Sequence, residues 1–220
     1  MFVLHQMVSV YGTSHVSQES MDVINEALDE HQPDIVALEL DMPRLESLLS
    51  DEEGRDGSLF MKVLKKFQQR IGRKTGVMPG DEMMYAYQRC ADDDMELALI
   101  DQDIRVTFGR LKKIPAKEKV KAGLSLVLSV FASKKMDLSK IPEDDTIEML
   151  LEEAKDQYPE IYRILVQERN VYMAKALKQL EEENPDKEIV AFVGAGHKEA
   201  IRELLDESYT EDFVAEKQAE

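Results

Sequence analysis

The chain has 220 residues, enough for one sizeable hydrophobic core, and its hydrophobic fraction of 43% is ordinary for a folded domain. Its net charge of −17 argues against general nucleic-acid binding, which needs clustered Lys and Arg, and disfavours an anionic membrane surface. A single cysteine excludes an internal disulfide and fits a reducing compartment. The N-terminus does not resemble a signal peptide, and the most apolar segment, residues 123–132, is far shorter than the ~20 residues that span a bilayer. We therefore expect a cytoplasmic protein with no direct membrane insertion in this chain.

Four short apolar runs predict strands. They are Val8–Tyr11, Ile35–Leu40, Glu96–Ile100 and Ile189–Val193. The runs are rich in Val, Ile, Leu and Ala and do not alternate with polar residues, which is typical of strands buried on both faces. The expected fold class is α/β, with a mixed or mostly parallel central sheet flanked by helices.

Helical periodicity occupies most of the remaining chain. Met21, Ile24 and Leu28 fall on one face of a first helix, with Ser17 as its N-cap. Further helices are predicted at 43–49, 58–71, 81–92, 103–113, 116–134, 143–156, 159–183 and 198–206. The Met-rich stretch 80–87 and Cys90 are predicted to be core.

The block before the last strand is predicted to be entirely helical. We interpret residues 1–220 as a single domain in which 103–183 form a long helical insertion, either a subdomain or a lid. Its apolar helix, 116–134, also predicts a homodimer contact.

The first and last predicted strands run into the same local motif. Gly12–His15 and Gly194–His197 are both Gly-x-x-His. Glycine permits φ > 0 and close backbone approach, so each motif predicts a sharp turn that presents a histidine. Because ligand sites in open α/β sheets form beyond the carboxyl ends of the strands, we expect the two histidines to meet at one edge.

Carboxylates follow the two middle strands. The second run ends in Glu39 and Asp41, and the third ends in Asp101 and Asp103. Glu39 can join the site, cap the next helix or pair with Arg44, and these alternatives stay open. Asp101 and Asp103 are predicted to cap the helix that follows them.

Two imidazoles and one carboxylate, completed by water, match an open catalytic site for a divalent metal. His15, Glu39 and His197 are the candidate ligands, and with few soft donors in the chain Mn, Co and Zn fit equally well. The alternative is that each histidine has a structural or capping role. His5 and His31 have no motif around them and are predicted to be surface or cap residues.

Four stretches in chain order resemble the TraB family. They are "GTSHVSQESMDVINEALDEHQPDIVALELDMPRLESLL" (12–49), "PGDEMMYAYQRCADDDMELALIDQDIRVTFGRL" (79–111), "ERNVYMAKALKQL" (168–180) and "VAFVGAGHKEAI" (190–201). Two positions depart from the family pattern: Gln102 stands in place of Arg and Asn170 in place of Asp, which weakens a site role at either. The resemblance also implies that full-length relatives carry a membrane-spanning C-terminal portion.

The resemblance implies a superfamily that includes the metal-dependent Tiki proteases, built around paired Gly-x-x-His motifs, and more distantly erythromycin esterase. It also includes proteins of peptide-pheromone shutdown. Carried over by motif, the centre of the site is His15, Glu39 and His197. Candidates for its support or for binding substrate carboxylates are Arg44, Glu82 and Arg169, since arginine can hold a carboxylate with two hydrogen bonds.

The leading hypothesis is a divalent-metal-dependent hydrolase that acts on a peptide or a related small amide. A rival from another class is a regulatory module that binds a peptide or small anion in the same crevice without turnover. A third interpretation makes the histidines structural and the protein a scaffold that associates through helix 116–134. Scaffolding gives no reason for the repeated Gly-x-x-His.

Overall fold

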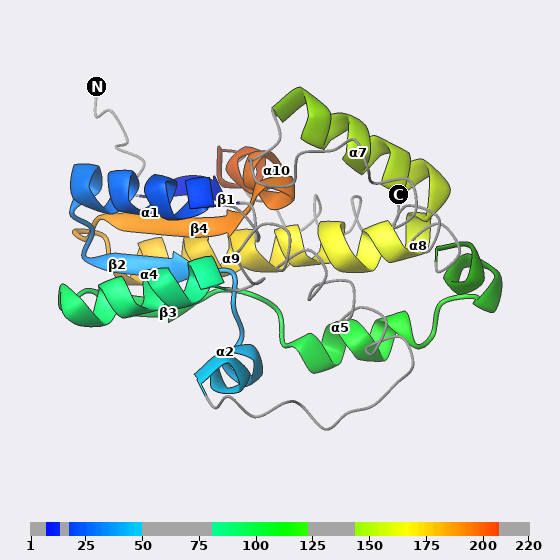
Figure 1. Cartoon of the computed structure of the whole chain (residues 1–220), viewed down its shortest axis with the longest axis horizontal. Coiled ribbons are helices and arrows are strands. Elements are labelled where there is room, and N and C mark those ends of the chain that lie inside the picture. The colour runs from blue at the N-terminus through cyan, green and yellow to red at the C-terminus, as the bar shows by residue number, and fades with distance from the viewer. Residues whose placement is uncertain (1–7, 14–17, 50–80, 123–143, 207–220) are drawn as a thin grey trace.

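The computed structural model describes residues 8–13, 18–49, 81–122 and 144–206, which form a sheet with helices on both faces (Figure 1). The sheet has the order β1-β4-β2-β3, and every neighbouring pair is parallel. Its strands are β1 (Val8–Thr13), β2 (Ile35–Leu38), β3 (Glu96–Leu99) and β4 (Ile189–Gly194). The α/β class and all four predicted strands are confirmed. All four carboxyl ends therefore lie on one edge.

Two apolar clusters, one on each face, explain why the strands do not alternate with polar residues. Ile35 and Ala37 face the cluster formed with α9 (Glu168–Glu183) and α10 (Ala195–Asp206). Val36 and Leu38 face the cluster formed with α1 (Gln18–His31) and α4 (Asp81–Asp92). Since both faces are covered, successive strand residues must all be apolar.

The second cluster also contains the methionine and cysteine side chains predicted to be core. Met83 and Cys90 of α4 are 1% and 3% exposed. Burial raises the pKa of the Cys90 thiol to about 11, so it is protonated at neutral pH and packs as a small apolar group.

The other described helices lie mostly beyond the carboxyl edge of the sheet (Figure 1). They are α2 (Met42–Leu49), α5 (Ile104–Leu111), a helical stretch at 116–122, α7 (Asp144–Gln157) and α8 (Pro159–Tyr162). A π-helical turn, η1 (Arg163–Gln167), joins α8 to α9, so the predicted helix 159–183 is continuous but contains a change of helical type. None of the helices in the described ranges combines the length and apolarity needed to cross a membrane.

Several predicted features lie outside the described residues: the N-cap Ser17, His5, helix 58–71, and helix 116–134 beyond residue 122. Within the block 103–183, α9 packs against the sheet through Val171, Met173, Ala174 and Leu177. The lid, the single domain and the homodimer stay predictions.

Gly12, which begins the first motif, has a different role from the one predicted. Gly12 lies inside β1, paired with Val193, and neither Gly12 nor Gly196 has a positive φ. A Cβ at Gly12 would lie 3.2 Å from the Cα of Ala195 and 3.0 Å from the Cδ of Lys198. Glycine is needed at residue 12 because the start of α10 passes close to the backbone of β1, not because the chain turns there.

Replacing Gly12 with alanine should therefore destabilise the protein by about 1–3 kcal/mol, as expected for overpacking against a neighbouring backbone. Gly109 in α5 is the matched control, because a Cβ there meets no atom within 4 Å. Gly109→Ala should stabilise by about 0.5–1 kcal/mol, since alanine is the better helix former. Urea unfolding measures both, and a Gly12→Ala protein as stable as wild type would contradict the close approach.

Candidate functional site

The two Gly-x-x-His motifs begin on neighbouring parallel strands. Thr13, the last residue of β1, pairs with Gly194, the last residue of β4. His15 lies outside the described residues. His197 lies in the first turn of α10, which begins at Ala195, earlier than the predicted residue 198, and is 8% exposed. The structure therefore brings the two strand ends together and describes the histidine that follows one of them.

Glu39 lies directly after β2 and is 2% exposed. Its Oε2 accepts a hydrogen bond from the backbone N–H of Gly194 at 2.6 Å. Its Oε1 accepts from Nη2 of Arg169 and lies 3.6 Å from Nε2 of His197. Of the alternatives left open by the sequence, the contacts favour membership of the strand-end cluster over a pair with Arg44.

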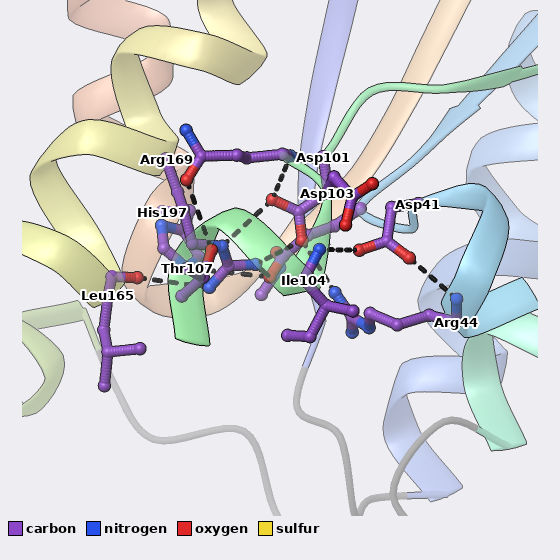
Figure 2. A network of polar contacts seen from close by, with 12 residues as sticks. Asp41, Arg44, Asp101, Asp103, Ile104, Thr107, Leu165, Arg169 and His197 are labelled. Carbon is purple, nitrogen blue, oxygen red and sulfur yellow. Dashed lines mark hydrogen bonds and ion pairs between the residues drawn. The ribbon is translucent and has the colours of Figure 1, made fainter. Parts of the chain in front are cut away.

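Arg169 of α9 lies at the centre of this cluster (Figure 2). Its Nε and Nη2 donate to the two carboxylate oxygens of Asp101 at 2.9 and 2.7 Å, and Nη2 also bonds Glu39. Its Nη1 donates to the carbonyl of Leu165 at 3.1 Å and lies 3.2 Å from Nε2 of His197. Burial disfavours the charged guanidinium, but bonding to Asp101 and the charge of Glu39 raise the pKa of Arg169 above its ordinary value. Arg169 is therefore a permanent, largely buried cation that joins the ends of β2 and β3.

The ring of His197 is held in one tautomer. Its Nδ1 lies 2.5 Å from Oδ1 of Asn170, which is 5% exposed. An amide oxygen only accepts hydrogen bonds, so Nδ1 carries the proton and Nε2 of the neutral ring keeps its lone pair. Asn170, which the sequence marks as a departure from the family pattern, thus orients the candidate ligand. A lone pair on Nε2 is what a metal or a hydrogen-bond donor requires.

Asp101 was predicted to cap the helix after it, and this prediction is wrong. Its Oδ1 accepts from the backbone N–H of Gln102 at 2.7 Å and from Arg169. Its Oδ2 accepts from Nη1 of Arg44 at 2.6 Å and again from Arg169. Both oxygens are thus occupied by two arginines, because the neighbouring strands β2 and β3 place Arg44 and Asp101 at the same edge.

The cap of α5 comes from two other aspartates. Asp103 accepts from the backbone N–H of Arg105 at 2.8 Å, so its predicted role is confirmed. Asp41 reaches the same helix: its Oδ2 accepts from the N–H of Ile104 at 2.5 Å and its Oδ1 from the N–H of Arg44 at 2.7 Å. One buried carboxylate therefore satisfies the first turns of α2 and α5, where a negative charge also suits the helix dipoles.

The remaining candidate positions are Gln102, which departs from the family pattern, the predicted residue Glu82, and the other described histidine, His31. Gln102 accepts from the hydroxyl of Thr107 at 3.2 Å, so it supports the start of α5. Glu82 is fully buried in the first turn of α4, and its substrate-binding role stays a prediction. His31, predicted to be a surface or cap residue, is the last residue of α1 and is partly buried. It donates to Glu188 at 3.0 Å and accepts from Tyr11 at 2.7 Å.

Among the residues that the structure describes, no group of three or more His, Cys, Asp and Glu side chains is arranged to hold a metal ion. The described pair of candidate donors is Glu39 and His197, and a third donor would come from His15.

The comparisons with known proteins place these residues in a family. The sequence model of the TraB/PrgY/gumN family matches residues 5–217. The chain belongs to the TraB/PrgY/gumN family. It is 32% identical over 215 residues to an uncharacterized protein of Methanocaldococcus jannaschii, covering 90% of this chain and 53% of that one. It is 28% and 27% identical over 195 residues to the TraB domain-containing proteins of Bos taurus and Homo sapiens, covering 78% of this chain and 52% of each. The chain thus spans about half the length of these relatives.

Removing the charge of Arg169 should cost more stability than removing an exposed arginine. Arg169→Met leaves Glu39 and Asp101 buried without their shared cation, so we expect a loss of about 3–5 kcal/mol. Arg169→Lys keeps the charge but cannot reproduce the planar fork of hydrogen bonds. Its stability should therefore fall between that of the wild type and that of Arg169→Met. The control is Arg105→Met, since Arg105 is 77% exposed and should contribute little. Chemical unfolding at neutral pH tests this, and equal losses at residues 105 and 169 would refute a central role for Arg169.

Proposed function

We propose that this protein is a divalent-metal-dependent hydrolase that acts on peptide or related amide bonds, with His15, Glu39 and His197 as metal ligands. The observation that supports this most is the approach of two buried donors, Nε2 of His197 and Oε1 of Glu39, to 3.6 Å at the carboxyl edge of the sheet. Two donors about 2.1 Å from one ion, at tetrahedral angles, lie roughly 3.4 Å apart. Only a small adjustment would let both reach the same ion.

The supports of these two donors also fit a metal site. Metal-binding histidines usually donate their second ring N–H to an oxygen, as His197 does to Asn170. Glu39 is fixed through its other oxygen by the N–H of Gly194, so Oε1 is directed at His197. The nitrogen and oxygen donors suit Mn, Co or Zn, and the sequence gives no ground for choosing between them.

Arg169 is the main competitor of a metal at this place. Its guanidinium bonds Oε1 of Glu39 and approaches Nε2 of His197, the two atoms a metal would use. The bonds from Nε and Nη2 to Asp101 can hold the side chain if its contacts to the other two residues are released. We infer that metal binding displaces the tip of Arg169 and leaves a positive charge beside the ion.

The residues then divide the work of hydrolysis. A bound metal would polarise a substrate carbonyl and lower the pKa of water. Glu39 would hold the metal through Oε1 while the backbone N–H of Gly194 fixes its Oε2. Arg169, anchored by Asp101, can bind a substrate carbonyl or carboxylate oxygen, and Arg44 fixes Asp101 from the other side.

A second candidate function is a regulatory protein that binds a peptide or small anion in this crevice without turnover. It is supported by the ion pairs of Arg169 with Glu39 and Asp101, which place a cation where an anionic ligand group could bind. Such a protein would bind its ligand with the same affinity in the presence and absence of a chelator. A hydrolase of the proposed kind would lose turnover.

Calorimetric titration of metal-stripped protein with Mn, Co and Zn tests the metal site. We expect saturable binding of one ion per chain, lost in the His15→Ala, His197→Ala double variant and in Glu39→Leu because both remove proposed ligands. His31→Ala is the matched control and should bind as wild type does, since His31 contacts Tyr11 and Glu188 instead. Protein that binds metal should then cleave members of a peptide library, and the double variant should not. Metal binding that survives in the double variant would sink the proposal.

A further inference from the structure

A pocket next to the candidate metal ligands is lined in part by Asn170. It has a volume of about 230 Å³ and is lined by residues of α7, α8, η1, α9 and α10. Asn170 belongs to both places, because it lines the pocket and its Oδ1 accepts from His197. The pocket is therefore one side chain away from the candidate active site.

The amide nitrogen of Asn170 is an unmet donor. The side chain is 5% exposed, and within the described part of the chain its one hydrogen bond is the contact of Oδ1 with His197. A buried donor without an acceptor costs about 1–3 kcal/mol, so its presence needs a reason. An acceptor oxygen on a bound ligand would satisfy it.

Two further polar groups line the same pocket without a partner among the described side chains: the hydroxyl of Tyr162 and the amide of Gln167. Burial raises the pKa of Tyr162, so it stays a neutral phenol that can donate or accept. Apolar surface comes from Val171, Ala200 and Leu204. A small number of polar groups that point into a partly apolar pocket is typical of a ligand site.

The charges around the pocket are balanced. Arg163 and Glu168 pair with each other, and Glu168 also pairs with Arg110. Lys155 and Glu203 have opposite charges, and neither has an ion pair in the described part of the chain. With neither sign in excess, the pocket suits a neutral group with hydrogen-bond acceptors and donors better than a free anion.

We propose that this pocket is a subsite for a peptide segment, whose carbonyl oxygen accepts a hydrogen bond from the amide nitrogen of Asn170. Its assignment to the substrate rests on the proposed hydrolase function, whereas peptide binding itself does not. Asn170 then bonds the ligand through its nitrogen and His197 through its oxygen. Since hydrogen bonds in series strengthen one another, an occupied pocket reinforces the orientation of His197.

The proposal can be tested on the full chain with a chelator present. The probe is N-acetyl-dialanine methylamide, a neutral peptide, titrated while the side-chain amide signal of Asn170 is followed by NMR. We expect saturable shifts of that signal. Ala200→Leu fills the pocket without touching the hydrogen-bonded groups and should weaken binding by at least about tenfold. Ala91→Leu, the same change at an exposed position of α4, should leave the affinity unchanged.

Three results would overturn the inference: no saturable shift, equal affinity in the Ala200→Leu and wild-type proteins, or a strong preference for the same peptide with a free carboxylate that Lys155→Ala removes. The last result would make the pocket an anion site. Metal titration of Ala200→Leu separates the two proposals, because none of the three proposed metal ligands is changed. Loss of peptide binding with metal binding intact supports the pocket, whereas unchanged peptide binding with metal binding intact refutes the pocket and leaves only the metal site.

Discussion

The architecture of this edge of the protein depends on one buried guanidinium. Glu39 and Asp101 follow neighbouring strands, and two carboxylates this close and this buried repel each other unless a cation lies between them. Arg169 supplies that cation from a helix on one face of the sheet, and it also fixes the distance between α9 and the strand ends. The polar cluster therefore holds α9 against the ends of β2 and β3, in addition to being a candidate site.

The parts of the fold that local sequence determines were predicted well. Runs such as Ile35–Leu38 are apolar at every position because both faces of the sheet are covered, so they could be recognised without knowing the strand order. The order itself was not predictable, and it decides which strand ends are neighbours. The position of Asp101 after a strand was visible, but its contact with Arg169, 68 residues away, was not. The capping of both α2 and α5 by Asp41 could not be predicted for the same reason, because Ile104 is 63 residues away in the sequence.

The departures from the family pattern show why a residue type must be interpreted with its neighbours. Asparagine at residue 170 reads as the loss of a charge, yet its oxygen still fixes the tautomer of His197 and its nitrogen becomes available to a second contact. Glutamine at residue 102 accepts a hydrogen bond from the hydroxyl of Thr107, which an arginine could not do because it has no acceptor. At each position the neutral side chain offers a hydrogen-bonding group that the charged residue lacks.

The π-helical turn Arg163–Gln167 sets the rotation of α8 about the helix axis relative to α9. Glu168 bonds the carbonyl of Arg163, five positions back, so the turn holds one residue more than an α-helix would. Each α-helical residue advances the helix by about 100°. α9 is packed against the sheet, so deleting that residue would leave Arg169 in place. It would instead rotate α8, and α7 before it in the chain, about the helix axis relative to the sheet. The one extra residue in this turn thus sets the direction in which α8 and α7 leave the carboxyl edge of the sheet.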